Sequence, residues 1–142
     1  MMVSTRGRYA LQVMIDLAEH NNGEFIPMKE VAKRQALSLK YLERILPVLT
    51  KNNLVTGVHG KGGGYRLNRA PESYRVGEIL RLTEGDLAPV SCLDSHRKYD
   101  SYLNEYSTMK MWNDFHKMTT DFFDSITIAD LLNAENIDNY VI

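Results

Sequence analysis

The sequence predicts a mainly helical fold with a small β-hairpin wing, a winged helix-turn-helix, followed by a long C-terminal helix. Three observations favour this fold class. Two amphipathic helical patterns follow one another before residue 52, a glycine-rich segment at 60–64 separates two short β-type segments, and a broad apolar face runs through residues 106–125. A short helix, a longer helix and a basic hairpin in succession are typical of winged domains that bind DNA.

The first 52 residues account for three helices. The first helix, with Ser4 or Thr5 as its N-cap, carries apolar residues at helical spacing as far as Ala18. A short second helix is expected before the turn at Ala36, and Ser38 caps the third. The buried stripe of this third helix is expected at Leu39, Leu42, Ile45, Leu46 and Leu49.

The rest of the chain divides into the wing, a loop and a C-terminal helical segment. Strands are expected over residues 54–59 and 65–68, joined by glycines that permit a positive φ at the hairpin tip. A further short helix ends near Gly85, residues 86–105 show no clean period, and a long helix covers 106–125. The expected organisation is 1–85 for the winged helix-turn-helix, 86–105 for the loop, and 106–142 for the long helix, a short helix capped by Thr127, and the tail.

Charge is distributed unevenly along the chain although its total is near zero. Residues 1–70 contain eleven Lys or Arg and five Asp or Glu, a net of +6, whereas residues 71–142 have a net of −7. A basic half suggests a surface for a polyanion. The asymmetry alone fits a chance distribution of solvated side chains equally well, but the basic half is also the half with the helix-turn-helix pattern.

The start of the third helix and the hairpin carry the candidate DNA contacts. Basic and short polar side chains at a helix N-terminus can meet base edges, and the helix dipole there favours phosphate. Glu43, one turn into the helix, can accept a hydrogen bond from a cytosine amino group, and Tyr41 can donate one to a phosphate oxygen. Hairpin residues would follow the DNA backbone or enter the minor groove. The expected contacts are Ser38, Lys40, Tyr41, Glu43 and Arg44 on the helix and His59, Gly60, Lys61, Gly62 and Arg66 on the hairpin.

Other functions fit the sequence less well. A solvated helix and hairpin would explain the same charges, more readily for Arg66 than for Lys61 at the exposed tip. The glycines do not form a P-loop, which requires a strand leading into a helix. The histidines are scattered and no catalytic triad or carboxylate pair is recognisable, so an enzyme is not expected. A protein-interaction module that uses the winged fold without DNA is the alternative.

The apolar face of the long helix is expected to form a two-fold dimer interface. A winged helix has little surface of its own to cover so wide a face, and pairing with a second copy would place two recognition helices on successive turns of DNA. Burial against the chain's own domain is the alternative. The expected interface residues are Met109, Trp112, Phe115, Phe122, Phe123 and Ile126.

Four segments of the chain resemble the Rrf-type bacterial regulators, the family of IscR, NsrR and CymR. These segments are residues 4–10, 39–44, 60–65 and 125–131. The resemblance implies a dimeric winged-helix regulator that contacts DNA through the third helix and the wing, with Thr5 and Arg6 at the start of the first helix added to the contacts. His59 and Lys61 stand where the iron–sulfur members carry arginine and proline, so a different target sequence is expected.

The loop at 86–105 corresponds to the sensor region of the cluster-binding relatives, which carry three cysteines there. Cys92 is the single cysteine of this chain and matches the first of them; Tyr106 and Met109 stand near the positions of the last cysteine and a following histidine. No cofactor and no metal are therefore expected, and the chain is closest in character to the cluster-less CymR-like members. A redox or metal sensor centred on Cys92, with Asp94 and His96, is the alternative.

The C-terminal tail, which ends in Tyr140, Val141 and Ile142, resembles the end of serine acetyltransferases, whose last isoleucine enters cysteine synthase. A terminal carboxylate on an aliphatic residue can mimic an amino-acid substrate. CymR-like members act with that enzyme, so cysteine synthase is an expected partner, and a frayed terminus is the alternative. We expect a cytoplasmic homodimeric repressor of sulfur and cysteine genes, without a membrane segment, that binds a double-stranded DNA operator.

Overall fold

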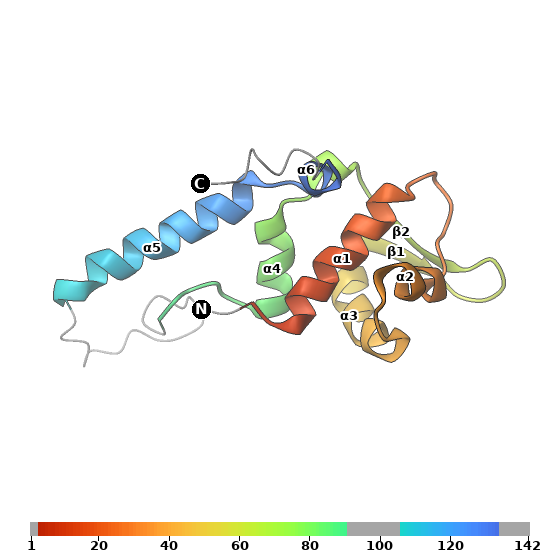
Figure 1. Cartoon of the computed structure of the whole chain (residues 1–142), viewed down its shortest axis with the longest axis horizontal. Helices are drawn as coiled ribbons and strands as arrows, with labels where there is room; N and C mark the ends of the chain where they lie inside the picture. The colour runs from red at the N-terminus through yellow and green to blue at the C-terminus, as the bar shows by residue number, and fades with distance from the viewer. Residues whose placement is uncertain (1–2, 91–105, 134–142) are drawn as a thin grey trace.

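The computed structural model describes residues 3–90 and 106–133 and confirms the predicted fold class (Figure 1). A bundle of short helices surrounds α1, a two-stranded hairpin projects at one side, and α5 extends from the other side. The elements are α1 (Thr5–Glu19), α2 (Met28–Gln35), α3 (Leu39–Lys51), β1 (Val55–Val58), β2 (Gly64–Leu67), the 3-10 turn η1 (Pro71–Ser73), α4 (Val76–Glu84), α5 (Tyr106–Ser125) and α6 (Ile128–Leu132).

The helix-turn-helix is formed by local signals that the sequence carries. The Ser38 hydroxyl accepts a hydrogen bond from the backbone N–H of Tyr41 at 3.3 Å and begins α3. Ala36 ends α2 in the left-handed region, with φ of 52°, so the chain turns within three residues. The predicted stripe of α3 is confirmed at four positions, since Leu42, Ile45, Leu46 and Leu49 are buried, while Leu39 is partly buried against the same core.

Buried Asp16 attaches α2 to α1. Its carboxylate, fully buried, accepts hydrogen bonds from the Arg34 guanidinium at 2.7 and 3.0 Å and from the Gln35 amide at 3.1 Å. A buried charge is tolerated only when it is paired and hydrogen-bonded in this way. The same contact raises the pKa of Arg34 above its usual value. Asp16 thus fixes the first helix of the helix-turn-helix against α1.

The hairpin is attached to the domain at its base. β1 and β2 are antiparallel, with Val55 opposite Leu67 and Val58 opposite Gly64. Ile26 adds a further bridge, exchanging backbone hydrogen bonds of 2.9 Å with Tyr65. The strands differ by a residue from the predicted bounds, because pairing includes Gly64: any side chain there would collide with the Ile26 carbonyl, so only glycine allows this approach.

The two C-terminal helices differ in where they pack. α5 projects away from the bundle, while α6 returns to lie against α1 (Figure 1). Thr127 and Asp130 form the capping box that begins α6, and Ile128 is fully buried in the core of the winged domain. The C-terminal segment therefore completes the core as well as carrying the projecting helix.

Candidate nucleic-acid interface

The exposed side of α3 carries the predicted contacts of the recognition helix. Lys40, Glu43 and Arg44 are exposed on α3, and Ser38 is exposed at its N-cap. Tyr41 is half-buried because its ring packs edge-on against Tyr9, with ring centroids 5.2 Å apart. The α1–α3 packing thus holds the tyrosine ring, while the charged side chains around it face solvent.

The hairpin lies beside α3 and ends in an exposed glycine tip. His59, Gly60, Lys61 and Gly62 are all exposed, and Gly60 and Gly62 have φ of 94° and 77°, which only glycine adopts readily. An open groove of about 370 Å³ separates the wing from α3. The residues that line this groove are Glu43, Leu46, Pro47, Thr50, Gly57, His59 and Tyr65.

Arg66 has a position that the sequence pattern did not indicate. Its guanidinium lies 4.4 Å from the centre of the Phe25 ring and donates a hydrogen bond to the Gly23 carbonyl at 2.9 Å. These contacts connect β2 to the loop after α1. Arg66 remains a predicted DNA contact, but in the free protein its head group binds the base of the wing.

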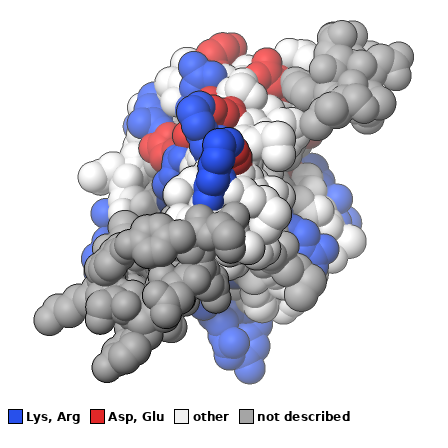
Figure 2. All heavy atoms as spheres, turned by 90° about the vertical axis from the view of Figure 1, so that its left-hand side faces the viewer, with Lys and Arg blue, Asp and Glu red and all other residues white. Residues whose placement is uncertain are grey.

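Four basic side chains of the predicted interface have no carboxylate partner among the described residues. Within residues 3–90 and 106–133, no ion pair or side-chain hydrogen bond joins Arg6, Lys40, Arg44 or Lys61 to another group. In contrast, Glu78 holds Arg69, and Asp124 holds Arg81. Figure 2 shows acidic and basic side chains together in the upper part of the visible face, whereas the lowest edge, the level of α3 in Figure 1, shows basic side chains without acidic ones beside them.

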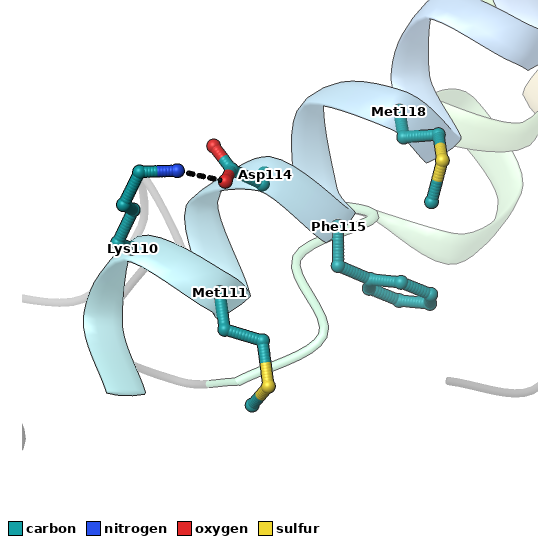
Figure 3. Close-up of a pocket in the computed structure, with 5 residues that line it drawn as sticks. All are labelled: Lys110, Met111, Asp114, Phe115 and Met118. Atoms are coloured by element: carbon teal, nitrogen blue, oxygen red, sulfur yellow. Dashed lines mark hydrogen bonds and ion pairs between the residues drawn. The ribbon is translucent and has the colours of Figure 1, made fainter. Parts of the chain in front are cut away.

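α5 carries an exposed apolar stripe that the sequence analysis identified in part. Met111, Phe115 and Met118 project from one side of the helix (Figure 3). Phe122, also exposed, lines the next groove together with Met118. These four residues line shallow grooves of about 570 and 500 Å³. Lys110 pairs with Asp114 at 2.6 Å along the edge, and Lys117 pairs with Asp121; each carboxylate raises the pKa of its lysine.

The expected dimer residues occupy three different environments. Phe115 and Phe122 are 38% and 39% exposed, whereas Met109, Trp112 and Phe123 are half-buried. Ile126 is 8% exposed and packs inside the chain, against Val76, Leu80 and Leu87.

Met111 was missed, and Met118 was predicted on the apolar face of the helix but not named for the interface, although they are the most exposed apolar residues of the stripe, at 53% and 65%. The alternating spacing of four, three and four residues from 111 to 122 is the signal that would have found them.

Cys92 and the tail residues Tyr140, Val141 and Ile142 lie outside the described residues. The donor set does not fit a cluster of the family type, because the whole sequence contains one cysteine. Within residues 3–90 and 106–133, no group of three His, Cys, Asp or Glu is placed to hold a metal ion. In the same part of the chain, no helix is long and apolar enough to cross a membrane.

A helix-turn-helix beside a two-stranded wing, with unpaired basic side chains on both, defines a winged-helix regulator that binds DNA. Residues 3–134 match the model of the Rrf2 family, described as an iron-dependent transcriptional regulator. The chain belongs to the Rrf2 family, whose members and the relatives below are transcriptional regulators and not enzymes.

Relatives of known name agree with this assignment. IscR of Erwinia tasmaniensis is 32% identical over 137 residues, covering 96% of this chain and 82% of that protein. Among solved structures, CymR, the global cysteine regulator of B. subtilis, has a TM-score of 0.78 at 30% identity and covers 94% of this chain and 97% of its own. IscR of T. potens has a TM-score of 0.73 at 37% identity, covering 95% and 88%.

Proposed function

We propose that this protein is a dimeric repressor that binds a pseudo-palindromic operator upstream of sulfur and cysteine genes. The observation that carries the DNA-binding part is the exposed polar face of α3 beside the wing, where Lys40 and Arg44 are unpaired among the described residues and Glu43 lines the groove. An unpaired lysine or arginine can neutralise a phosphate without first losing a protein partner. The role of α3 is base readout in the major groove, and the role of the wing is to contact the backbone or minor groove.

The proposed dimer follows from the palindromic spacing of the α5 stripe. About a two-fold axis between Phe115 and Met118, an antiparallel copy of α5 brings Phe115 opposite the partner's Met118 and Met111 opposite the partner's Phe122. Each contact then joins a methionine sulfur to an aromatic ring, which is favourable. A second copy would cover Met111, Met118 and Phe122, which are 39–65% exposed in the single chain.

The charges beside the stripe favour the same antiparallel arrangement. The order Lys110, Asp114, Lys117, Asp121 is itself palindromic about a point between residues 115 and 116, one residue from the axis of the stripe, and positions paired about that point have opposite signs. Lys110 would therefore approach the partner's Asp121, and Asp114 the partner's Lys117. A parallel pair in register would instead bring like charges together, which is unfavourable.

The proposed control of sulfur and cysteine genes rests on the similarity of this chain to CymR and on its having a single cysteine. CymR, described as the global cysteine regulator of B. subtilis, matches nearly the whole fold. The chain also lacks the set of three cysteines expected of cluster-binding members. The second candidate is an iron- or redox-responsive regulator that senses through Cys92, which the description of the family as iron-dependent favours.

Selection of bound fragments from the source genome, with full-length protein purified without oxygen, tests the proposal. A symmetric site upstream of sulfur or cysteine genes supports it, and footprinting should show protection on both half-sites. A site next to iron–sulfur assembly genes would favour the second candidate. Absence of any enriched duplex, with a folded dimer confirmed by light scattering, would favour a protein-interaction module.

A further inference from the structure

The junction between α5 and the winged domain is small and well defined. Backbone hydrogen bonds from Val76 to the Ile126 carbonyl at 2.9 Å and from Ile128 to the Tyr74 carbonyl at 3.0 Å form an antiparallel bridge. This bridge attaches the C-terminal end of α5 to the start of α4. A single bridge fixes a point of attachment, but the direction in which the helix leaves that point needs further contacts.

Arg81 and Asp124 supply a directional contact between the two helices. The Arg81 guanidinium on α4 donates two hydrogen bonds to the Asp124 carboxylate on α5, at 2.8 and 2.6 Å. A two-pronged contact between planar groups fixes orientation as well as distance. Asp124 raises the pKa of Arg81 through this contact, and both side chains are about two-fifths exposed. A pair this exposed adds little to folding stability, so its loss should leave the domain folded.

Gly77 leaves room on α4 for the Asp124 carboxylate and the Arg81 guanidinium to meet. A Cβ atom at this position of α4 would collide with the Asp124 carboxylate. On the other side of the junction, Leu80 and Ile126 are buried together, with Phe123 packed against them. Polar, backbone and apolar contacts therefore surround the junction, and the residue beside the Arg81–Asp124 pair has no side chain.

α5 amplifies any rotation at this junction. Its 20 residues span about 30 Å, so a rotation of about 10° displaces the far end by about 5 Å. Figure 1 shows that α5 leaves the bundle past α4, and α4 is its main contact among the described elements. In a two-fold dimer, the same rotation changes the separation of the two recognition helices, which must match half-sites about 34 Å apart.

We propose that Arg81, Asp124 and Gly77 set the angle between α5 and the DNA-binding domain, and so determine which half-site spacing the protein accepts. These are positioning residues that do not contact DNA. The inference rests on the proposed dimeric, operator-binding function. It deepens that function by assigning spacing selectivity to the α4–α5 junction rather than to the recognition helix or the dimer stripe.

The experiment measures fluorescence anisotropy of full-length protein on duplexes whose two half-sites are identical but separated by the natural spacing or by one base pair more or less. We expect the wild type to prefer the natural spacing by about tenfold, since a mismatched spacing must be met by deforming the DNA. Asp124→Asn and Gly77→Ala should each reduce this preference to about threefold or less, at unchanged affinity for a single half-site. Light scattering should show dimers throughout.

Glu78→Gln is the matched control. Glu78 also lies on α4 and also binds an arginine, since one guanidinium nitrogen of Arg69 donates to both of its carboxylate oxygens at 2.6 Å, but this pair does not involve α5. The control should keep the wild-type spacing preference. The inference is wrong if Asp124→Asn and Gly77→Ala retain that preference or weaken binding equally at every spacing. A wild type that binds no duplex, or is a monomer, would overturn the proposed function itself.

Discussion

Single basic side chains differ in whether a carboxylate already neutralises them, and several of those on the proposed DNA surface are unpaired among the described residues. Lys61 and Arg44 face solvent without a partner among the described residues, whereas Lys117 is held by Asp121 one turn along α5. Binding of a polyanion releases counterions from DNA only for charges that reach the phosphates. A basic side chain without a carboxylate partner is therefore a better candidate for a DNA contact than one that is already paired.

Lys61→Ala is expected to weaken binding to all duplex sequences by a similar factor. The ammonium group at the wing tip would contact phosphate or the minor-groove edge, so its loss should reduce the salt dependence by about one counterion. Anisotropy titrations at several salt concentrations measure this slope. Lys117→Ala removes the same charge from α5 and should leave the slope unchanged; an unchanged slope for Lys61→Ala would mean that the wing does not touch DNA.

Glu43→Ala is expected to change base preference rather than overall affinity. The Glu43 carboxylate lies on the exposed face of α3 and lines the groove towards His59. It can accept a hydrogen bond from a cytosine amino group, and it repels base edges that present only acceptors. Such a contact discriminates against the wrong base pair by about 1–3 kcal/mol. Competition between operator variants changed at single positions measures the effect. Glu72→Ala, at the exposed η1 turn, is the control, and equal losses on every variant would contradict base readout.

At the scale of elements, the sequence predicted the helices well because the residues that cap a helix lie next to it in the chain. Ser38 and Thr127 act as the N-caps that the sequence indicated, and α3 continues through Pro47 to Lys51. The predicted strand bounds differ from the observed ones by one residue. Gly64 pairs as part of β2 while lying against the Ile26 carbonyl, and this contact with a residue remote in the sequence could not be predicted locally. Arg66 likewise stacks on Phe25, a contact that no local pattern reveals.

The broad apolar face of α5 shows why periodicity alone could not define the candidate interface. Helical spacing identified Phe115 and Phe122 together with Ile126, although Ile126 fills a cluster against α4. Which part of an apolar face is covered depends on the tertiary packing of the element, and among the described elements α4 packs against the C-terminal end of α5. The remaining stripe is the part available for a second copy.

Met118→Glu is expected to convert the dimer to a monomer. A carboxylate at the most exposed position of the stripe would be buried without a partner in the proposed helix pair, which costs several kcal/mol at each of two symmetric positions, on the order of a 100-fold or larger loss in association. Sedimentation velocity measures the mass. Asn113→Glu adds the same charge to an exposed position of α5 outside the stripe and should remain dimeric; a dimeric Met118→Glu would place the interface elsewhere.

At the scale of the whole molecule, the two halves of the chain have complementary tasks. The half with a net charge of +6 carries α3 and the wing, and the half with −7 carries the α5 stripe and its paired charges. DNA contacts and the proposed self-association thus use separate surfaces, connected through the α4–α5 junction. A signal that alters the long helix would reach the operator by changing the separation of two rigid domains, without a change inside either domain.

The single cysteine allows a test of where such a signal enters. We expect anaerobically purified protein to show no visible absorbance, because one thiolate is too few for the ligand sets that hold iron–sulfur clusters. Cys92→Ser should then bind the operator as tightly as the wild type, with or without a thiol oxidant. Anisotropy under both conditions measures this, and Cys92→Ala controls for the serine hydroxyl. A visible chromophore, or oxidant-dependent release that Cys92→Ser abolishes, would instead assign sensing to Cys92, and operator control to iron or redox state.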